Sequence, residues 1–294
     1  MKNSPPFRGR RVERPASLLG THWEHRPALG CEVTSHEAEA IGTGKQKMTT
    51  IIGSGLLARS FSKITFSRDC LVLAAGVSNS SEQRDSEFRR EAEVVEAAIR
   101  KFPSSRVIYF STCSILQKDQ TPYILHKLAM ESLVAALSSS FHIFRLPQVV
   151  GATRNMTLVS YLVESVLRGR RVLVQAHARR NLVDVNDVNR LIHHLIEHDI
   201  GRNSIQTLAA AHSVHVREVL EEIGELLQIA PICDVVDAGE SYDIQIDFVK
   251  THFGHGDPLM KTDYWQSVLR KNVSIIASKI RSTTICPVKA GPEF

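Results

Sequence analysis

Apolar and polar positions alternate in blocks from residue 48 onward, and the blocks predict strands and helices in turn. Four short apolar runs, rich in β-branched and aromatic residues, are of strand length. They lie at 49–52, 69–76, 106–115 and 142–151. Between them, residues 87–102 carry an apolar stripe near the helical period of 3.6, and residues 121–137 read as a helix that begins with a proline. Strands separated by helices predict an α/β fold with a doubly wound, Rossmann-like parallel sheet.

A turn of small residues follows the first of these strands. Gly53-Ser-Gly55 stands between the strand and a helix start, and Ala58 fills the third small position of a GxGxxA pattern. In that context Gly53 permits the tight turn, and Gly55 lets the backbone approach a pyrophosphate at the helix N-terminus. The turn therefore predicts a dinucleotide site, with a turn used only for packing as the alternative.

The segment after the first helix is shorter than in the usual dinucleotide-binding fold, which continues there with further strands. Only about ten residues separate the first helix from the strand that begins at Asp69, which is too few for a strand, a crossover helix and a return strand. We expect the usual second and third strands to be absent, together with the acidic residue that binds the adenosine ribose. The sheet edge beside the turn then needs cover, from residues 1–47 or from a second subunit. Arg59 is either a contact to an adenosine phosphate or a solvated side chain.

Tyr123 and Lys127 are four residues apart in the helix that begins with a proline, so their side chains project from one face. A nearby ammonium stabilises a phenolate and lowers the tyrosine pKa from about 10, which suits proton exchange with a hydroxyl or carbonyl. Thr112, at the end of the preceding strand, can hydrogen-bond the same oxygen. The alternative is that this face of the helix is simply solvated.

In their order along the chain, the segments IIGSGLLA, LVLAAG, YFSTCSI, YILHK, FRLPQVVG and RNLVDVNDV resemble the extended short-chain dehydrogenase/reductase family, specifically its NAD-dependent sugar-nucleotide epimerases, dehydratases and reductases. The resemblance runs from Met48 to about Tyr242. It implies NAD or NADP as cofactor, held by Gly53, Gly55, Leu56, Leu57, Ala58, Ala74, Ala75, Gly76, Lys127 and Pro147.

The same resemblance implies that Tyr123 is the catalytic acid/base, that Lys127 holds the nicotinamide ribose and that Thr112 polarises the substrate. Arg180 matches an arginine set against the diphosphate of a nucleotide sugar, for which a bidentate cation is apt. The implied activity is oxidation, reduction or epimerisation of a nucleotide-linked sugar for surface polysaccharide assembly. Dehydration is disfavoured, because Cys113 and Ser114 stand where dehydratases have Asp-Glu. The family's first glycine is also replaced, by Ile52.

The division of the chain that we expect is a disordered leader at 1–47, a dinucleotide-binding core at 48–155 and a small α/β substrate lobe at 156–294. The lobe is interleaved with the end of the sheet, and its last 40 residues carry no predicted element. The leader has neither helical nor strand periodicity, and Met48 is the natural start that we expect. A homodimer is one way to cover the sheet edge.

Composition narrows the function classes. The chain has 294 residues, of which 43% are hydrophobic, and no apolar run approaches the ~20 residues of a membrane span. More than half of the net charge of +5 lies in residues 1–47, so nucleic-acid binding, which we do not expect, would have to act through that segment. Five scattered cysteines without a CxxC pair favour reduced thiols and a cytoplasmic protein.

Three alternatives remain at this point. The first is a non-catalytic module that binds sugar nucleotides through the same fold. The second is a metal site at His194 and His198, four apart on a helix, completed by His252 and His255. The third is a nucleophilic role for Cys113, which has no basic partner nearby in the sequence. We expect no metal.

Overall fold

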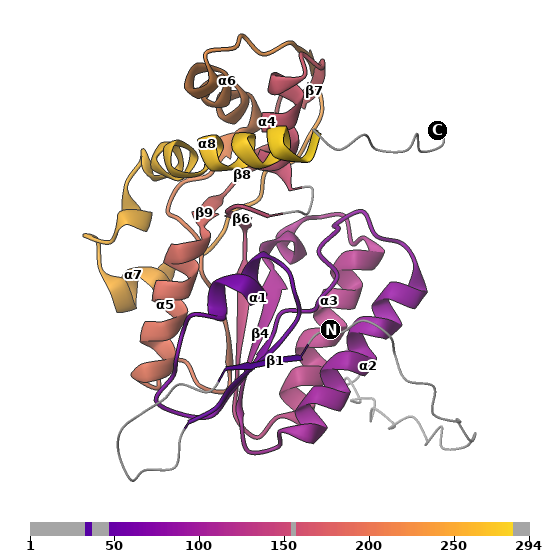
Figure 1. Cartoon of the computed structure of the whole chain (residues 1–294), viewed down its shortest axis with the longest axis vertical. Helices are drawn as coiled ribbons and strands as arrows, with labels where there is room; N and C mark the ends of the chain where they lie inside the picture. Colours follow the sequence, from indigo (N-terminus) through magenta and orange to yellow (C-terminus); the bar gives the residue numbers. More distant parts are fainter. Residues whose placement is uncertain (1–32, 37–46, 154–156, 285–294) are drawn as a thin grey trace, which may run out of the picture. The chain divides into compact units, whose positions relative to one another are not determined.

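The computed structural model describes residues 33–36, 47–153 and 157–284 (Figure 1). In this part of the chain the largest sheet has six strands in the order β1-β2-β3-β4-β5-β10. From β2 to β10 the neighbours are parallel, and β1 is antiparallel to β2. These strands are β1 (Val33–His36), β2 (Thr49–Ile52), β3 (Cys70–Leu73), β4 (Arg106–Thr112), β5 (Phe141–Leu146) and β10 (Ser204–Thr207). The α/β fold with a parallel central sheet is therefore confirmed.

Helices cover both faces of this sheet, because successive strand residues point to opposite sides. On one face α2 and α3 pack against Ile52, Leu71, Tyr109 and Ile143. On the other, α1 and α5 pack against Ile51, Val72, Ile108 and Phe144. The helices are α1 (Leu56–Phe61), α2 (Asp85–Lys101), α3 (Pro122–Leu137) and α5 (Val185–Glu197). Local sequence fixes two of the helix starts, since the side chains of Thr121 and Asp184 cap α3 and α5.

The absence of the usual second and third strands is confirmed in the described residues. β2 pairs directly with β3, Thr49 opposite Cys70, and residues 62–69 form turns and irregular chain. The free edge of β2 is covered by β1, whose Val33 is the partner of Ile52. Cover by the leader was one of the two expected solutions. These four residues depart from the expectation that residues 1–47 are disordered, because an exposed edge offers hydrogen bonds that even a sequence without strand periodicity can take up. The rest of the leader lies outside the described residues.

The remaining elements build the second lobe and the connections around the site. They are β6 (Gln148–Val150), α4 (Leu158–Leu167), β7 (Val172–Gln175), β8 (Arg179–Arg180), β9 (Leu182–Asp184), β11 (Val214–His215), α6 (Val216–Leu227), β12 (Cys233–Val236), α7 (Asp247–Phe253) and α8 (Tyr264–Thr284), with short 3-10 turns η1 (Cys113–Leu116) and η2 (Pro258–Met260). Three two-stranded sheets pair β11 with β8, β12 with β7 and β6 with β9. No helix in the described residues is both long and apolar enough to cross a bilayer.

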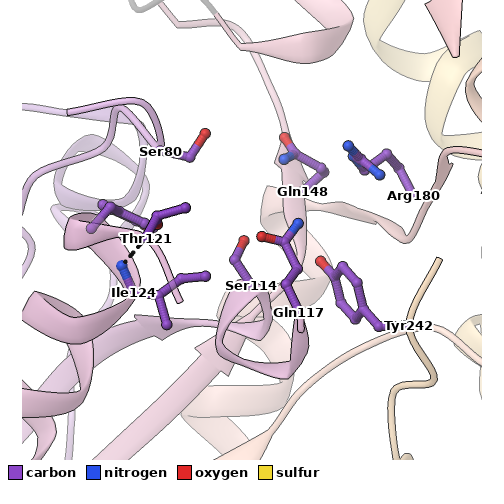
Figure 2. A pocket seen from close by; sticks show the side chains of 9 residues that line it. Ser80, Ser114, Gln117, Thr121, Ile124, Gln148, Arg180 and Tyr242 are labelled. Atoms are coloured by element: carbon purple, nitrogen blue, oxygen red, sulfur yellow. Dashed lines mark hydrogen bonds between the residues drawn. The ribbon is translucent and has the colours of Figure 1, made fainter. Parts of the chain in front are cut away.

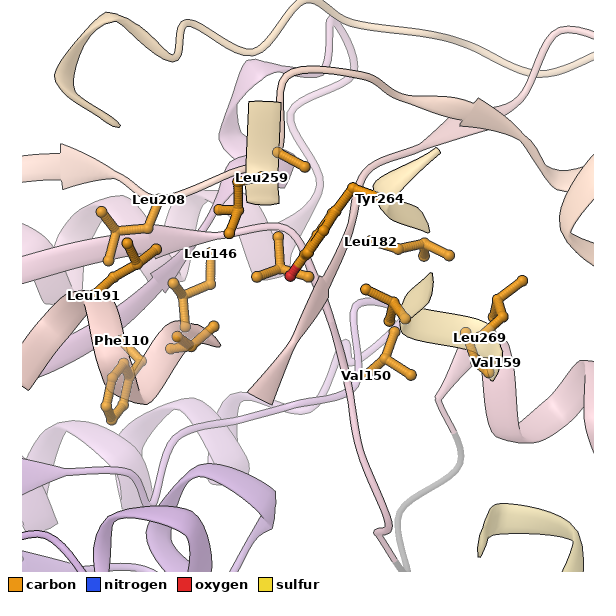
Figure 3. Close-up of a cluster of buried hydrophobic side chains, with 14 of the residues drawn as sticks. Phe110, Leu146, Val150, Val159, Leu182, Leu191, Leu208, Leu259, Tyr264 and Leu269 are labelled. Carbon is orange, nitrogen blue, oxygen red and sulfur yellow. The ribbon is translucent and has the colours of Figure 1, made fainter. Parts of the chain in front are cut away.

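One apolar cluster continues from the sheet into this lobe (Figure 3). It joins Phe110 and Leu146 of the sheet to Leu182 of β9 and to Leu269 of α8. Much of the chain end that had no predicted element is therefore α8. Its first residue, Tyr264, donates a hydrogen bond to the Asp187 carboxylate at 2.7 Å, which ties α8 to the helix beside the sheet.

His142 is an exception to the apolar interior. It is fully buried on β5, and neither ring nitrogen has a hydrogen-bond partner among the described residues. Burial, followed by the charge of Arg106, lowers its pKa to about 4. Two unsatisfied polar atoms in a dry site oppose folding, because the unfolded chain hydrates them.

We expect His142→Leu to stabilise the protein by about 1–3 kcal/mol in urea unfolding at pH 7. Below pH 7 the wild type should lose stability progressively down to about pH 4. The reason is that the imidazole of the unfolded chain binds a proton near pH 6.5, whereas the imidazole of the folded protein does not. The loss should reach about 3 kcal/mol and be missing from the variant. His212→Leu, at an exposed position, is the control and should change little. A destabilised His142→Leu would show that the ring makes an interaction not seen here.

Candidate functional site

The glycine turn after β2 has the backbone geometry that its sequence predicts. Gly53 has φ of +130°, and a Cβ there would lie 2.4 Å from the Ala74 carbonyl oxygen, so only glycine fits. At Gly55 a Cβ would meet no atom within 4 Å, so the backbone there is open. Arg59 folds back and donates to the Ser54 carbonyl at 2.7 Å, which places its cation beside the turn.

The other segments assigned to the cofactor lie around the same edge of the sheet. Leu56 and Leu57 are the first two residues of α1. A Cβ on Gly151 would lie 2.9 Å from a methyl of Leu56, so the Leu56 side chain packs against the segment that follows β6. Residues 74–76 follow the carboxyl end of β3, and Pro147 follows that of β5. Carboxyl ends of parallel strands at one edge form the crevice where such sheets bind ligands.

Thr112 and Tyr123 are brought together, as the sequence predicts. Thr112 ends β4, and its hydroxyl accepts from the Ser114 backbone N–H at 3.0 Å. Tyr123 lies in the first turn of α3 and is 7% exposed. Burial raises the pKa of Tyr123 to about 12, although the nearby Thr112 side chain acts to lower it.

The contacts of Lys127 do not match the expectation that its ammonium lowers the pKa of Tyr123. Its Nζ lies 2.8 Å from an oxygen of the buried Glu91 carboxylate and donates to the Tyr109 hydroxyl at 3.1 Å. A Cβ on Gly76 would sit 2.8 Å from the same nitrogen, so the ammonium lies directly under this glycine. The prediction of a lowered Tyr123 pKa is wrong for this structure, because Glu91 compensates the charge that was to stabilise the phenolate.

A small polar pocket of about 110 Å³ lies beside Tyr123. Figure 2 shows Ser80 and Thr121 on one side of it and Arg180 and Tyr242 on the other. The remaining lining residues are Ser114, Gln117, Ile124 and Gln148. Arg180 is the one charged residue among them, and the others are hydroxyl, amide or apolar side chains. Such a lining suits a ligand with many hydroxyl groups and a negative charge.

Two residues of the site were not found from the sequence. Glu91 lies on the apolar stripe of α2, among Phe88, Val95 and Ala98. A charged residue at a position where the helical period places apolar residues is the signal that points to it. Tyr242 lies in a loop after β12 and lines the same pocket as Ser114. No local pattern marks Tyr242, since only the fold of the second lobe brings it to the pocket.

The two other candidate sites find no support. Among the described residues no group of three or more His, Cys, Asp or Glu side chains is placed to hold a metal ion. The rings of His194 and His198 are tilted against each other with centroids 4.1 Å apart, and His252 packs on Phe248. For Cys113, burial raises the pKa of the thiol to about 12, so it is protonated and a poor nucleophile at neutral pH.

Comparisons with known proteins agree with this fold. The model of the "NAD dependent epimerase/dehydratase family" matches residues 68–207, just under half of the chain. The resemblance seen in the sequence is therefore confirmed. The match begins after the glycine turn, close to the start of β3. No curated protein sequence matches the chain significantly.

Several solved structures share the fold. The Bordetella bronchiseptica enzyme WbmH, in complex with NAD+, has a TM-score of 0.57 and 19% identity, covering 74% of this chain and 78% of that one. The UDP-glucose 4-epimerase of Thermus thermophilus with NAD has a TM-score of 0.56 and 16% identity, with coverages of 75% and 80%. RMD from Pseudomonas aeruginosa with NADPH has a TM-score of 0.55 and 15% identity, with coverages of 72% and 82%.

Proposed function

We propose that the protein is an NAD(P)-dependent oxidoreductase or epimerase that acts on a nucleotide-activated sugar, in the assembly of surface polysaccharide. The observation that carries the proposal is the placement of Tyr123, with the Thr112 side chain close by, at the wall of a polar pocket that also contains Arg180. Similar structures hold NAD+, NAD or NADPH, and one of them is named as acting on a UDP-sugar. The free Cys70, Cys113 and Cys233 suit a reducing cytoplasm.

The described residues fit the pyrophosphate and nicotinamide parts of such a cofactor. The open backbone at Gly55 leaves room for a phosphate, and Lys127 makes two of the three hydrogen bonds that an ammonium can donate. On the adenosine side, β1 lies where a further parallel strand would carry an acid, so this part of the cofactor has fewer partners. When bound, the nicotinamide would supply or accept a hydride.

The residues of the chain then have separate tasks. Tyr123 exchanges a proton with the substrate oxygen, and Thr112 hydrogen-bonds the same oxygen and keeps the phenol in place. Arg180 binds the diphosphate, because a planar guanidinium can donate two parallel hydrogen bonds to phosphate oxygens. The amides of Gln117 and Gln148 bind sugar hydroxyls and orient the ring.

Cofactor binding tests the proposal directly. We expect calorimetry to show binding of NADH or NADPH to the wild type, and Gly55→Val to weaken it at least about tenfold, because the new side chain fills the space left for the phosphate. Gly55→Val should leave the free energy of unfolding within about 0.5 kcal/mol of the wild type. Gly256→Val, at another open glycine outside the turn, is the matched control. If neither cofactor binds the wild type, the enzyme proposal fails.

A second candidate is a non-catalytic module that binds sugar nucleotides. Two observations favour it, the absent adenosine-side strands and the engagement of Lys127 by Glu91. The module should bind UDP-sugars without NADH or NADPH, and Arg180→Gln should weaken that binding. Binding of NADH or NADPH together with a sugar nucleotide would exclude it.

A further inference from the structure

A closed network of hydrogen bonds surrounds the carboxylate of Glu91 on α2. Its side chain is fully buried. One oxygen accepts from the Val77 backbone N–H at 2.7 Å and lies 3.0 Å from Nε2 of His126. The other oxygen accepts from the Tyr109 hydroxyl at 2.7 Å and from Lys127 at 2.8 Å. Burial would raise the pKa of Glu91, but the His126 hydrogen bond and the Lys127 charge hold it well below its usual range. Glu91 is therefore a carboxylate at any physiological pH.

This arrangement decides where the charge of Lys127 acts. The Lys127 side chain is 4% exposed, its ammonium hydrogen-bonds Glu91 and the Tyr109 hydroxyl, and the Tyr109 ring centroid lies 5.2 Å from Nζ. When two opposite charges lie at hydrogen-bond distance in a buried site, their electrostatic effects on a third group a few ångströms further away largely cancel. Lys127 has the sequence position to stabilise a phenolate at Tyr123, yet its charge is compensated.

The groups that face Tyr123 fit this picture. The groups that act on the pKa of Tyr123 are Thr112 from the end of β4, Glu91 from α2 and Tyr242 from the loop after β12. Tyr109 of β4 also interacts with Tyr123 electrostatically, and none of these four groups is a cation. Arg180 lines the same pocket, and its charge acts to lower the pKa of Tyr242. A phenol in such surroundings keeps its proton.

We propose that Glu91 is a positioning residue that binds Lys127 and cancels its charge. Tyr123 then keeps its proton and acts as a proton donor. Such a site favours protonation of a carbonyl oxygen, which is the direction of sugar reduction. The inference about direction rests on the proposed function. The inference about Glu91 and Tyr123 does not, because both residues can be examined in the free protein. In the reductive step the carbonyl carbon gains a hydride from the reduced nicotinamide and its oxygen gains the Tyr123 proton, which solvent then replaces.

Tyrosinate formation in the cofactor-free protein tests the inference without any substrate. The signal of Tyr123 is isolated as the near-ultraviolet difference between each protein and the same protein carrying Tyr123→Phe. In the wild type we expect almost no tyrosinate from Tyr123 up to about pH 10. Glu91→Gln removes the compensating charge, and we expect at least about tenfold more tyrosinate from Tyr123 at that pH. Circular dichroism checks that each protein remains folded.

Glu131→Gln is the matched control. Glu131 is also a buried carboxylate, on α3, and it pairs with Arg145 at 2.6 Å and has no hydrogen bond or ion pair with Lys127. Its loss should disturb the core to a similar degree and leave the Tyr123 titration unchanged. Equal tyrosinate in Glu91→Gln and the wild type would overturn the proposal, and so would an increase of the same size in Glu131→Gln.

A second measurement covers the case in which Glu91→Gln does not fold. Nitrogen NMR of the wild-type lysines should show one ammonium whose protons exchange slowly, because they are buried and bound to a carboxylate. This signal should be absent from the double variant Glu91→Gln with Lys127→Met, in which both charges are removed together. A neutral amine at Lys127, or fast exchange of its protons, would overturn the proposal. If the network is found but neither NADH nor NADPH binds, the proposed function fails while the role of Glu91 stands.

Discussion

Tyr123→Phe is expected to lower turnover by about 10²–10⁴-fold and to leave cofactor affinity nearly unchanged. The substitution removes the exchangeable proton and keeps the ring, which packs with Val77 and Ile124. Steady-state kinetics with a nucleotide-sugar substrate would measure the first effect, and calorimetry with NADPH the second.

The pH dependence adds a second test of the same residue. Because burial raises the pKa of Tyr123 to about 12, the proton donor is present throughout the neutral range. Reduction should therefore not fall with rising pH until the pH approaches that pKa, whereas oxidation of a hydroxyl should become faster as the phenolate forms. More than about a tenth of wild-type turnover in Tyr123→Phe would remove the acid/base assignment.

Lys127→Met should have the largest effect on stability, with a loss of about 3–5 kcal/mol in the free energy of unfolding. The reason is that Glu91 would remain buried without the Lys127 ammonium, and only Val77, Tyr109 and His126 would remain as its hydrogen-bond partners. Cofactor binding should be lost as well, because the ammonium next to Gly76 is the cation that we propose for the nicotinamide ribose. Urea unfolding and calorimetry measure the two effects.

The double variant with Glu91→Gln is the control for this prediction. Removing both charges should recover most of the lost stability but none of the cofactor binding. In the wild type the pair stabilises the fold fully above the unfolded glutamate pKa of about 4.3 and loses its effect as the pH falls, because the folded pKa of Glu91 is lower. The double variant should lack this acid sensitivity. A double variant as unstable as Lys127→Met would show that the charges are not what matters.

Local patterns account for much of the fold. The alternation of short apolar runs with helical stripes gave the parallel sheet, and the spacing from Gly55 to Asp69 showed that two strands are absent. The Thr112–Tyr123 contact was also predictable, because a strand end and the first turn of the following helix meet at one edge of such a sheet.

Other features depend on contacts between distant segments. β1 forms because β2 has an unpaired edge, and nothing within residues 33–36 reveals that edge. The charge of Lys127 was assigned to Tyr123 from helix spacing alone, whereas Glu91, which comes from another helix, decides its effect. Tyr242 reaches the pocket only through the path of the second lobe.

The direct pairing of β2 with β3 has a consequence for the handedness of the chain. The connections through α1 and α2 each advance one strand in the same direction along the sheet. Yet Phe61 of α1 packs on the face that contains Val72, and Val95 of α2 packs on the face that contains Leu71. Two connections that step the same way over opposite faces have opposite hands. One of them is therefore a left-handed crossover, an arrangement found in only about 2% of such connections.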